Sequence, residues 1–135
     1  MNTTTFLNRI IGNLFGTQTA PPLPTQYWLG LSSTAPGIDG TGVTEPSSVG
    51  TGYSRVRLVS LSAPSNGTIS NTAAVSFDES TMQWGTMTHY VIYDAPTGGN
   101  LLMFGLLTIS RAVEQNTVIT IRAGELTITL ENPPT

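Results

Sequence analysis

The sequence predicts an all-β protein, an antiparallel β-sandwich of jelly-roll-like form with about eight strands and a short N-terminal helix. Short apolar runs recur along most of the chain, and clusters of Gly, Pro, Asn and Ser separate them. The last two runs alternate apolar and polar residues with a period of two, as strands with one wet face do. At 135 residues the chain has the length of one domain.

The first sixteen residues are the only stretch with clear helical spacing of apolar side chains. Thr3, Thr4 or Thr5 provides an N-cap, and Gly16 is well placed to end the helix. A helix of about three turns is marginal alone in water. The Pro-rich residues 17–25 predict an extended connector, so we expect a tethered helix that inserts into a neighbouring protein. Its docking residues share one apolar stripe: Phe6, Ile10, Ile11, Leu14 and Phe15.

The predicted sandwich domain covers residues 26–131, and residues 132–135 form a short tail. The candidate strands are the apolar runs bounded by turn residues: 26–32, 53–61, 68–70, 74–77, 86–94, 101–109, 117–122 and 125–131. Between the first two lies a Gly- and Pro-rich loop, residues 33–52. It exceeds the ~12–15 residues usual in compact domains, so we expect it to be functional or to be ordered by a neighbour.

The strands within residues 88–109 pose a problem, because they are apolar on both faces. One face belongs in the sandwich core, and the other must be covered by the helix, by the 33–52 loop or by a second copy. Each exposed Leu or Phe that becomes buried contributes ~1.5–3 kcal/mol, so self-association is the simplest solution. We therefore predict a homo-oligomer, a ring or trimer, with this hairpin at the interface: Tyr90, Ile92, Leu101, Leu102, Met103 and Phe104.

The composition excludes several functions and favours a protein that is part of a larger assembly. Only 10 % of residues are charged and Lys is absent, so little charge repulsion keeps copies apart. A net charge of -3 without a basic cluster gives no reason to expect a nucleic-acid partner. No apolar run approaches the ~20 residues of a membrane span. Cysteine is absent, which removes disulfides, thiolate metal sites and cysteine nucleophiles.

No catalytic apparatus is visible, and we expect no metal and no cofactor. The single histidine, His89, lies five residues from Asp94 on one strand, so their side chains point to opposite faces. Trp28 and Trp84 could form a sugar-stacking platform, but buried aromatic anchors of a core or interface are the commoner case, and we favour it.

Three blocks of sequence resemble a known family: "GTGVTEP", "WGTMTHY" and "GGNLL". Together with an aromatic–Arg–Val strand and a closing "AGELTITL", they are similar to small tailed-bacteriophage virion proteins of the tail-fibre or minor-tail kind. The resemblance covers roughly residues 25–130. It implies a structural protein of the virion that contacts other virion proteins.

We therefore expect an oligomeric tail-fibre or baseplate-associated component, assembled through the hairpin face and the docking helix, and not an enzyme. Two alternatives stay open. One is a capsid decoration protein, of cement or head-fibre type. The other is a host-receptor or carbohydrate-binding module that contacts a host surface glycan through Trp28 and Trp84.

Overall fold

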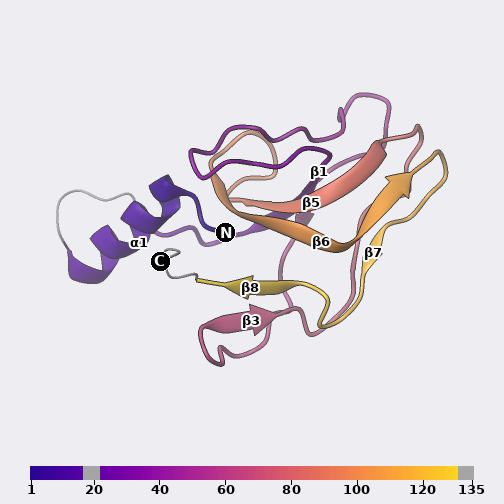
Figure 1. Ribbon diagram of the computed structural model, residues 1–135. Helices are drawn as coiled ribbons and strands as arrows, with labels where there is room; N and C mark the ends of the chain where they lie inside the picture. Colours follow the sequence, from indigo (N-terminus) through magenta and orange to yellow (C-terminus); the bar gives the residue numbers. More distant parts are fainter. Residues whose placement is uncertain (17–21, 131–135) are drawn as a thin grey trace.

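The computed structural model describes residues 1–16 and 22–130, which form one helix and eight strands (Figure 1). Residues 17–21 of the predicted connector and all of the predicted tail lie outside these residues. The elements in chain order are α1 (Thr4–Phe15), β1 (Trp28–Ser32), β2 (Val56–Arg57), β3 (Thr68–Ser70), β4 (Val75–Ser76), β5 (Gly85–Tyr93), β6 (Leu101–Val113), β7 (Thr120–Ile121) and β8 (Thr127–Thr129).

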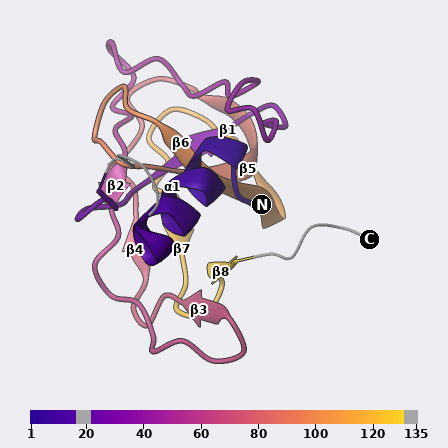
Figure 2. The same ribbon diagram turned by 90° about the vertical axis from the view of Figure 1, so that its left-hand side faces the viewer.

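The strands form one main sheet and two small ribbons. The sheet has the order β2-β1-β5-β6, and β3 pairs with β8 and β4 with β7, all antiparallel. The β3–β8 ribbon is set apart from the sheet and lies below it (Figure 2). The predicted fold class, a sandwich-like all-β chain with one short helix, is confirmed. The second layer consists of the two ribbons. Its four strands, β3, β4, β7 and β8, are only two or three residues long.

Of the predicted strands, 68–70 keeps its bounds, whereas 53–61, 117–122 and 125–131 are shortened to two or three residues. The run 53–61 keeps only Val56–Arg57 as a strand, and the side chains of its first residues, Tyr53 and Arg55, bond to Glu45 of the 33–52 loop. β6 is longer than predicted and carries a bulge. Met87 pairs with Arg111 and His89 with Leu106, so β6 has extra residues between these pairs that no residue of β5 faces.

The core lies on one face of the sheet, between it and the ribbons. Leu29, Leu31 and Ile92 from the sheet are inaccessible to solvent or nearly so. They pack with the aromatic cluster of Tyr53, Phe77 and Trp84, whose rings lie within 6.5 Å of one another by centroid. Trp84 meets both Tyr53 and Phe77 edge to face. Such contacts add to the stabilisation from burial.

The opposite face of the hairpin is covered by the chain's own 33–52 loop. Val91, Tyr93, Leu101 and Phe104 form a second buried cluster, and Val43 of the loop packs against it. Backbone bonds join the loop to other segments, with Thr4 N–H donating to Ile38 O and Thr81 N–H to Thr51 O, both at 2.9 Å. The loop thus packs on its own domain and covers this part of the hairpin, whereas Leu106, two residues beyond Phe104 on the same face of β6, is 74 % exposed.

Gly30 of β1 leaves room for the side chains of Tyr53 and Glu45 above the sheet. A Cβ on Gly30 would lie 2.7 Å from the Tyr53 hydroxyl and 2.9 Å from a Glu45 carboxylate oxygen. We expect Gly30→Ala to lower the free energy of unfolding by about 1–3 kcal/mol through overpacking, measured by urea denaturation.

The matched control is Thr86→Ala, at an exposed position of the same sheet, which should change stability by less than about 0.5 kcal/mol. Tyr53→Phe in the Gly30→Ala background should recover part of the loss by removing the nearer atom. An unchanged unfolding midpoint for Gly30→Ala would contradict this packing of the loop.

Candidate functional site

The most organised polar cluster joins the 33–52 loop to the strands beneath it. Both oxygens of Glu45 accept hydrogen bonds from Arg55, Oε1 from Nη2 at 2.7 Å and Oε2 from Nε at 3.0 Å. The Tyr53 hydroxyl donates to Glu45 Oε2 at 2.5 Å and accepts from the Leu31 N–H at 3.1 Å. Burial and then the bond to Glu45 raise the pKa of Tyr53 far above its usual value, so it remains a neutral donor.

The same arginine extends the cluster to the β5–β6 turn. Its Nη1 donates to the carbonyls of Ala95 and Gly98, both at 2.8 Å. The guanidinium carbon lies 3.6 Å from the centre of the Tyr93 ring, a cation–π contact. The Arg55 side chain is only 7 % exposed. A buried charge needs this degree of pairing, and among cationic side chains only a guanidinium presents such a fork of donors.

This cluster explains the sequence blocks that carry the family resemblance. "GTGVTEP" supplies Glu45, the aromatic–Arg–Val strand supplies Tyr53 and Arg55, and the turn of "GGNLL" supplies the carbonyl of Gly98. The sequence did not predict that these blocks contact one another, and Glu45 was considered only as a weak calcium ligand. The available signal was a Glu and an Arg, each within a motif block, in a chain with very few charges.

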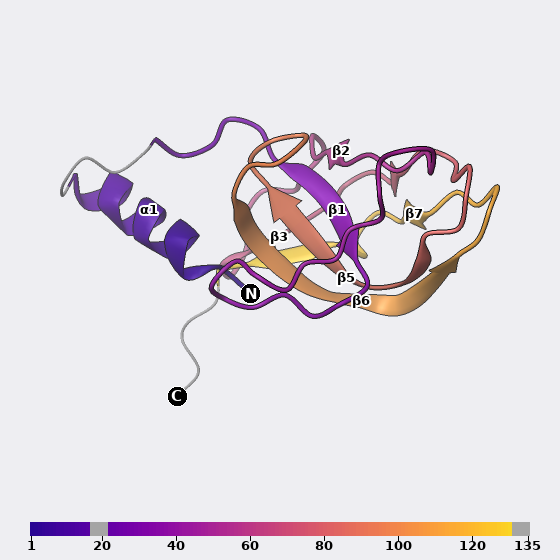
Figure 3. The ribbon, with the colours of Figure 1, turned by 90° about the horizontal axis from the view of Figure 1, so that it is seen from above.

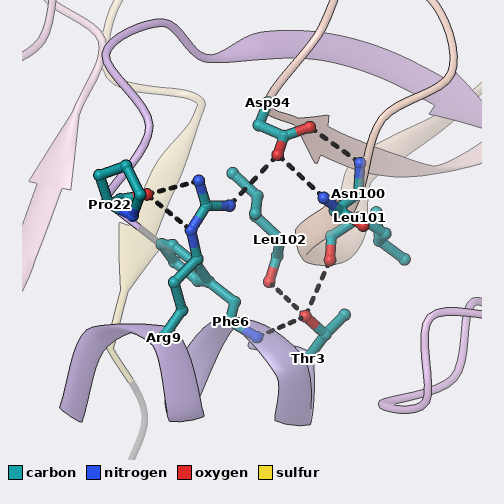
Figure 4. Close-up of polar contacts among 8 residues, drawn as sticks. All are labelled: Thr3, Phe6, Arg9, Pro22, Asp94, Asn100, Leu101 and Leu102. Carbon is teal, nitrogen blue, oxygen red and sulfur yellow. Dashed lines mark hydrogen bonds and ion pairs between the residues drawn. The ribbon is translucent and has the colours of Figure 1, made fainter. Parts of the chain in front are cut away.

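A second polar cluster pins the start of α1 to the same turn (Figure 4). Thr3 caps the helix, with its hydroxyl accepting from the Phe6 N–H and donating to the carbonyl of Leu101 at 2.8 Å. Arg9 Nη1 lies 3.2 Å from Asp94 Oδ2, and its Nε and Nη2 donate to the Pro22 carbonyl. The predicted cap and the predicted stop at Gly16, which has φ of +61°, are confirmed.

The five predicted docking residues of α1 divide into two groups. Phe6 is buried against the body of the domain at 4 % exposure, and Ile10 is half-buried. Ile11, Leu14 and Phe15 are exposed, the last two at 70 % and 75 %. The helix extends outward from one end of the sheet (Figure 3). It is thus docked by its first turns and apolar at its free end.

The predicted hairpin interface lies inside the chain. Ile92, Leu101, Leu102 and Phe104 are buried, and Tyr90 and Met103 are half-buried. As a surface for self-association this part of the prediction is corrected, because Leu101 and Phe104 lie in the cluster that Val43 of the loop covers. Tyr90, Ile92 and Met103 pack with the main core on the other face.

The predicted glycan platform is not assembled. Trp84 is buried in the aromatic cluster, and its indole N–H donates to Thr51 O at 2.9 Å. Trp28 is half-buried and pairs with Tyr93, the last residue of β5, whereas Trp84 immediately precedes its first residue. The two indoles therefore lie at opposite ends of β5. A core role for Trp84 is the correct interpretation, and it rules this residue out as a glycan contact.

Metal-binding side chains do not converge in the part of the chain that the structure describes. Within residues 1–16 and 22–130, no three His, Asp or Glu side chains come together as metal ligands would. His89 Nδ1 lies 2.8 Å from the hydroxyl of its neighbour Thr88, and burial lowers the pKa of His89. The described helix is too short and too polar to cross a membrane.

The fold and its clusters define a small antiparallel β-protein whose charged groups hold loops in place. Residues 2–129 match the family described as Podophage GP4 fiber I protein gp80. Because the match spans nearly the whole chain, the protein belongs to this phage fibre family, and the predicted tail-fibre-like resemblance is confirmed. Membership implies a structural, virion-associated component. A comparison with curated proteins gives no match.

Arg55→Lys tests whether the fork of Arg55 holds the 33–52 loop. Lysine keeps the charge but cannot bond both Glu45 oxygens and the turn carbonyls together. We expect the free energy of unfolding to fall by about 1–3 kcal/mol, measured by urea denaturation. Arg57→Lys, at an exposed position two residues along, is the matched control and should change stability by less than about 0.5 kcal/mol. Equal effects of the two variants would show that the fork is not needed.

The Arg9–Asp94 pair predicts a pH dependence of helix docking. Burial raises the pKa of Asp94, but hydrogen bonds from Asn100 and Arg9 outweigh it, so the pKa lies below the usual value. The stabilisation is then complete above the unfolded-state value of about 3.9 and is lost as pH falls through the folded-state value. The protection factors of the α1 amides, which are the exchange rates of the unfolded chain relative to the observed rates at the same pH, should fall over that range in the native chain and depend less on pH in Asp94→Asn. The same pH profile in both would contradict the assignment.

Proposed function

We propose that this protein is a structural subunit of the tail-fibre or baseplate region of a tailed phage particle, attached through the free end of α1. The carrying observation is that Ile11, Leu14 and Phe15 are exposed on a helix whose first turns are fixed to the domain. Monomeric proteins rarely expose contiguous apolar patches unless these bind something. A short amphipathic helix that enters an apolar groove is a recurring mode of recognition.

The rest of the molecule supports a scaffold that presents this helix. Arg9 is bonded both to Asp94 in the hairpin turn and to the carbonyl of Pro22. Thr3 is bonded to the edge of β6. These contacts hold the helix in one orientation, so that its free end is pre-organised for a partner and less entropy is lost on binding.

Capsid decoration is the alternative location, and the same docking helix would serve it. Copy number separates the two, because a decoration protein covers the head in many copies whereas a fibre or baseplate component is present in few. Quantitative mass spectrometry of purified particles, with the major capsid protein as reference, decides between them. A copy number near that of the capsid protein would overturn the fibre or baseplate location.

Leu14→Glu and Phe15→Glu test the docking role. Each places a charge where an apolar contact is expected, so we expect incorporation into particles to fall by at least about tenfold. The measurement is the amount of the protein per purified particle after complementation. Both residues are exposed, so the melting temperature of the isolated protein should stay unchanged.

The matched control is Val49→Glu, which adds the same charge at an apolar residue of the 33–52 loop that is 84 % exposed. It should be incorporated normally. Normal incorporation of both helix variants would exclude the free end of α1 as the attachment point.

A further inference from the structure

Asn66 and Gly67 form the two-residue turn that leads into β3. Ser65 and Thr68 pair across this turn, each N–H donating to the other's carbonyl, at 2.9 and 3.0 Å. Asn66 has φ of +53° and Gly67 has φ of +74°, and positive φ at both central positions is the type I′ geometry that Asn-Gly favours. Both residues are exposed, so water reaches the turn.

The main-chain nitrogen of Gly67 is open to reaction with the side chain that precedes it. Within residues 1–16 and 22–130, the Gly67 N–H has no hydrogen-bond acceptor. Glycine has no Cβ to shield its nitrogen, and nothing lies within 4 Å of the position that a Cβ of Gly67 would take. A side-chain amide carbon can therefore approach this nitrogen closely.

Asn116 provides a comparison within the same chain. Among the described residues other than glycine, Asn66 and Asn116 are the two with positive φ, the latter at +61°, and both are exposed. Asn116 is followed by the β-branched Thr117, whose N–H donates to Ser80 Oγ at 2.9 Å. The two asparagines share a backbone conformation, but the next nitrogen is both unshielded and unbonded only at Asn66.

We propose that Asn66 is a site of spontaneous deamidation, with water as the co-reactant and no enzyme. The deprotonated Gly67 nitrogen bonds to Asn66 Cγ, and the side-chain amide group leaves as ammonia, which gives a cyclic imide. Water then opens the imide at one of its two carbonyl carbons. Opening at Cγ gives aspartate, and opening at the main-chain carbonyl gives isoaspartate. The net change is one amide hydrolysed to one carboxylate, without oxidation or reduction.

The reaction takes place when the turn opens. The imide ring closes only after the main chain at Asn66 rotates out of its left-handed conformation, and the closed turn prevents that rotation. The turn ends a ribbon whose two strands, β3 and β8, have three residues each. Short segments with few buried contacts and exposed backbone bonds open at low free energy. The fold therefore slows the reaction at Asn66 without blocking it.

Isoaspartate places one extra carbon atom in the main chain, so the two-residue turn cannot close with the same pairing. The turn supports the β3–β8 ribbon, because Gly67 O accepts from the Leu130 N–H at 3.4 Å and Thr68 pairs with Thr129. Gly67 also lines an apolar groove of about 410 Å³ between this ribbon and α1, whose described lining residues carry no charge. Either product thus adds a negative charge at the edge of that groove.

Peptide mass spectrometry of the full-length native chain, incubated at mildly acidic and at mildly alkaline pH, tests the inference. We expect Asn66 to lose its amide at least about tenfold faster than Asn116, as a mixture of aspartate and isoaspartate. The rate should rise with pH, because the Gly67 nitrogen must lose its proton. Conversion no faster than at Asn116, or aspartate without isoaspartate, would overturn the inference.

Asn66→Gly is the matched variant, because Gly-Gly also adopts the type I′ turn but offers no side-chain amide. After incubation, the β3 and β8 amides of the native chain should have lost protection from hydrogen exchange, whereas Asn66→Gly should keep its initial protection. Asn116→Gly is the control and should age as the native chain does. An equal loss of protection in Asn66→Gly and the native chain would contradict a role of Asn66 in the ageing of the ribbon.

Discussion

The ion pair between Glu45 and Arg55 is the constraint on which the rest of the structure depends. It closes the 33–52 loop over the second face of the hairpin, and it ties that loop to the carbonyls of the β5–β6 turn. Without it, the apolar side chains of Val91, Tyr93 and Phe104 would lose part of their cover. The pair contributes little as an isolated charge contact. Its effect comes from position, because one guanidinium joins three segments that are far apart in the sequence.

The turn held by Arg55 is also the anchor for the helix. Asp94 receives the N–H of Asn100 within the turn and the guanidinium of Arg9 from α1. Gly99 is required there, because it has φ of +75° and a Cβ would lie 2.5 Å from Asp94 Oδ1. The loop, the turn and the helix therefore form one connected unit. A disturbance of the turn is transmitted to both the covered face and the projecting helix.

A chain with few charges and a helix that ends in exposed apolar residues is suited to an assembly. The body buries the apolar surfaces that it can reach with its own loop and first helical turns. Other large apolar side chains stay exposed at scattered positions, among them Val49, Val59 and Leu106, whereas Leu14 and Phe15 lie next to each other at the projecting end of α1. We therefore propose this end of the helix as the attachment point.

The sequence by itself determined the element types, because these depend on local patterns. The helix, with a Thr cap among residues 3–5 and its stop at Gly16, follows from spacing and terminal residues, and the eight strands follow from short apolar runs between turn residues. The structure selects Thr3 as the cap. Only the tertiary structure decided what covers the two-sided hairpin and which charges meet. The separation of Glu45 from the Gly98 carbonyl, and of Arg9 from Asp94, exceeds any local period, so no pattern within one segment encodes those contacts. The tertiary structure also decides which residues of α1 are exposed. The apolar stripe of the helix has the same pattern along its whole length, but the body of the domain extends only beneath its first turns, so Phe6 is buried and Leu14 is exposed.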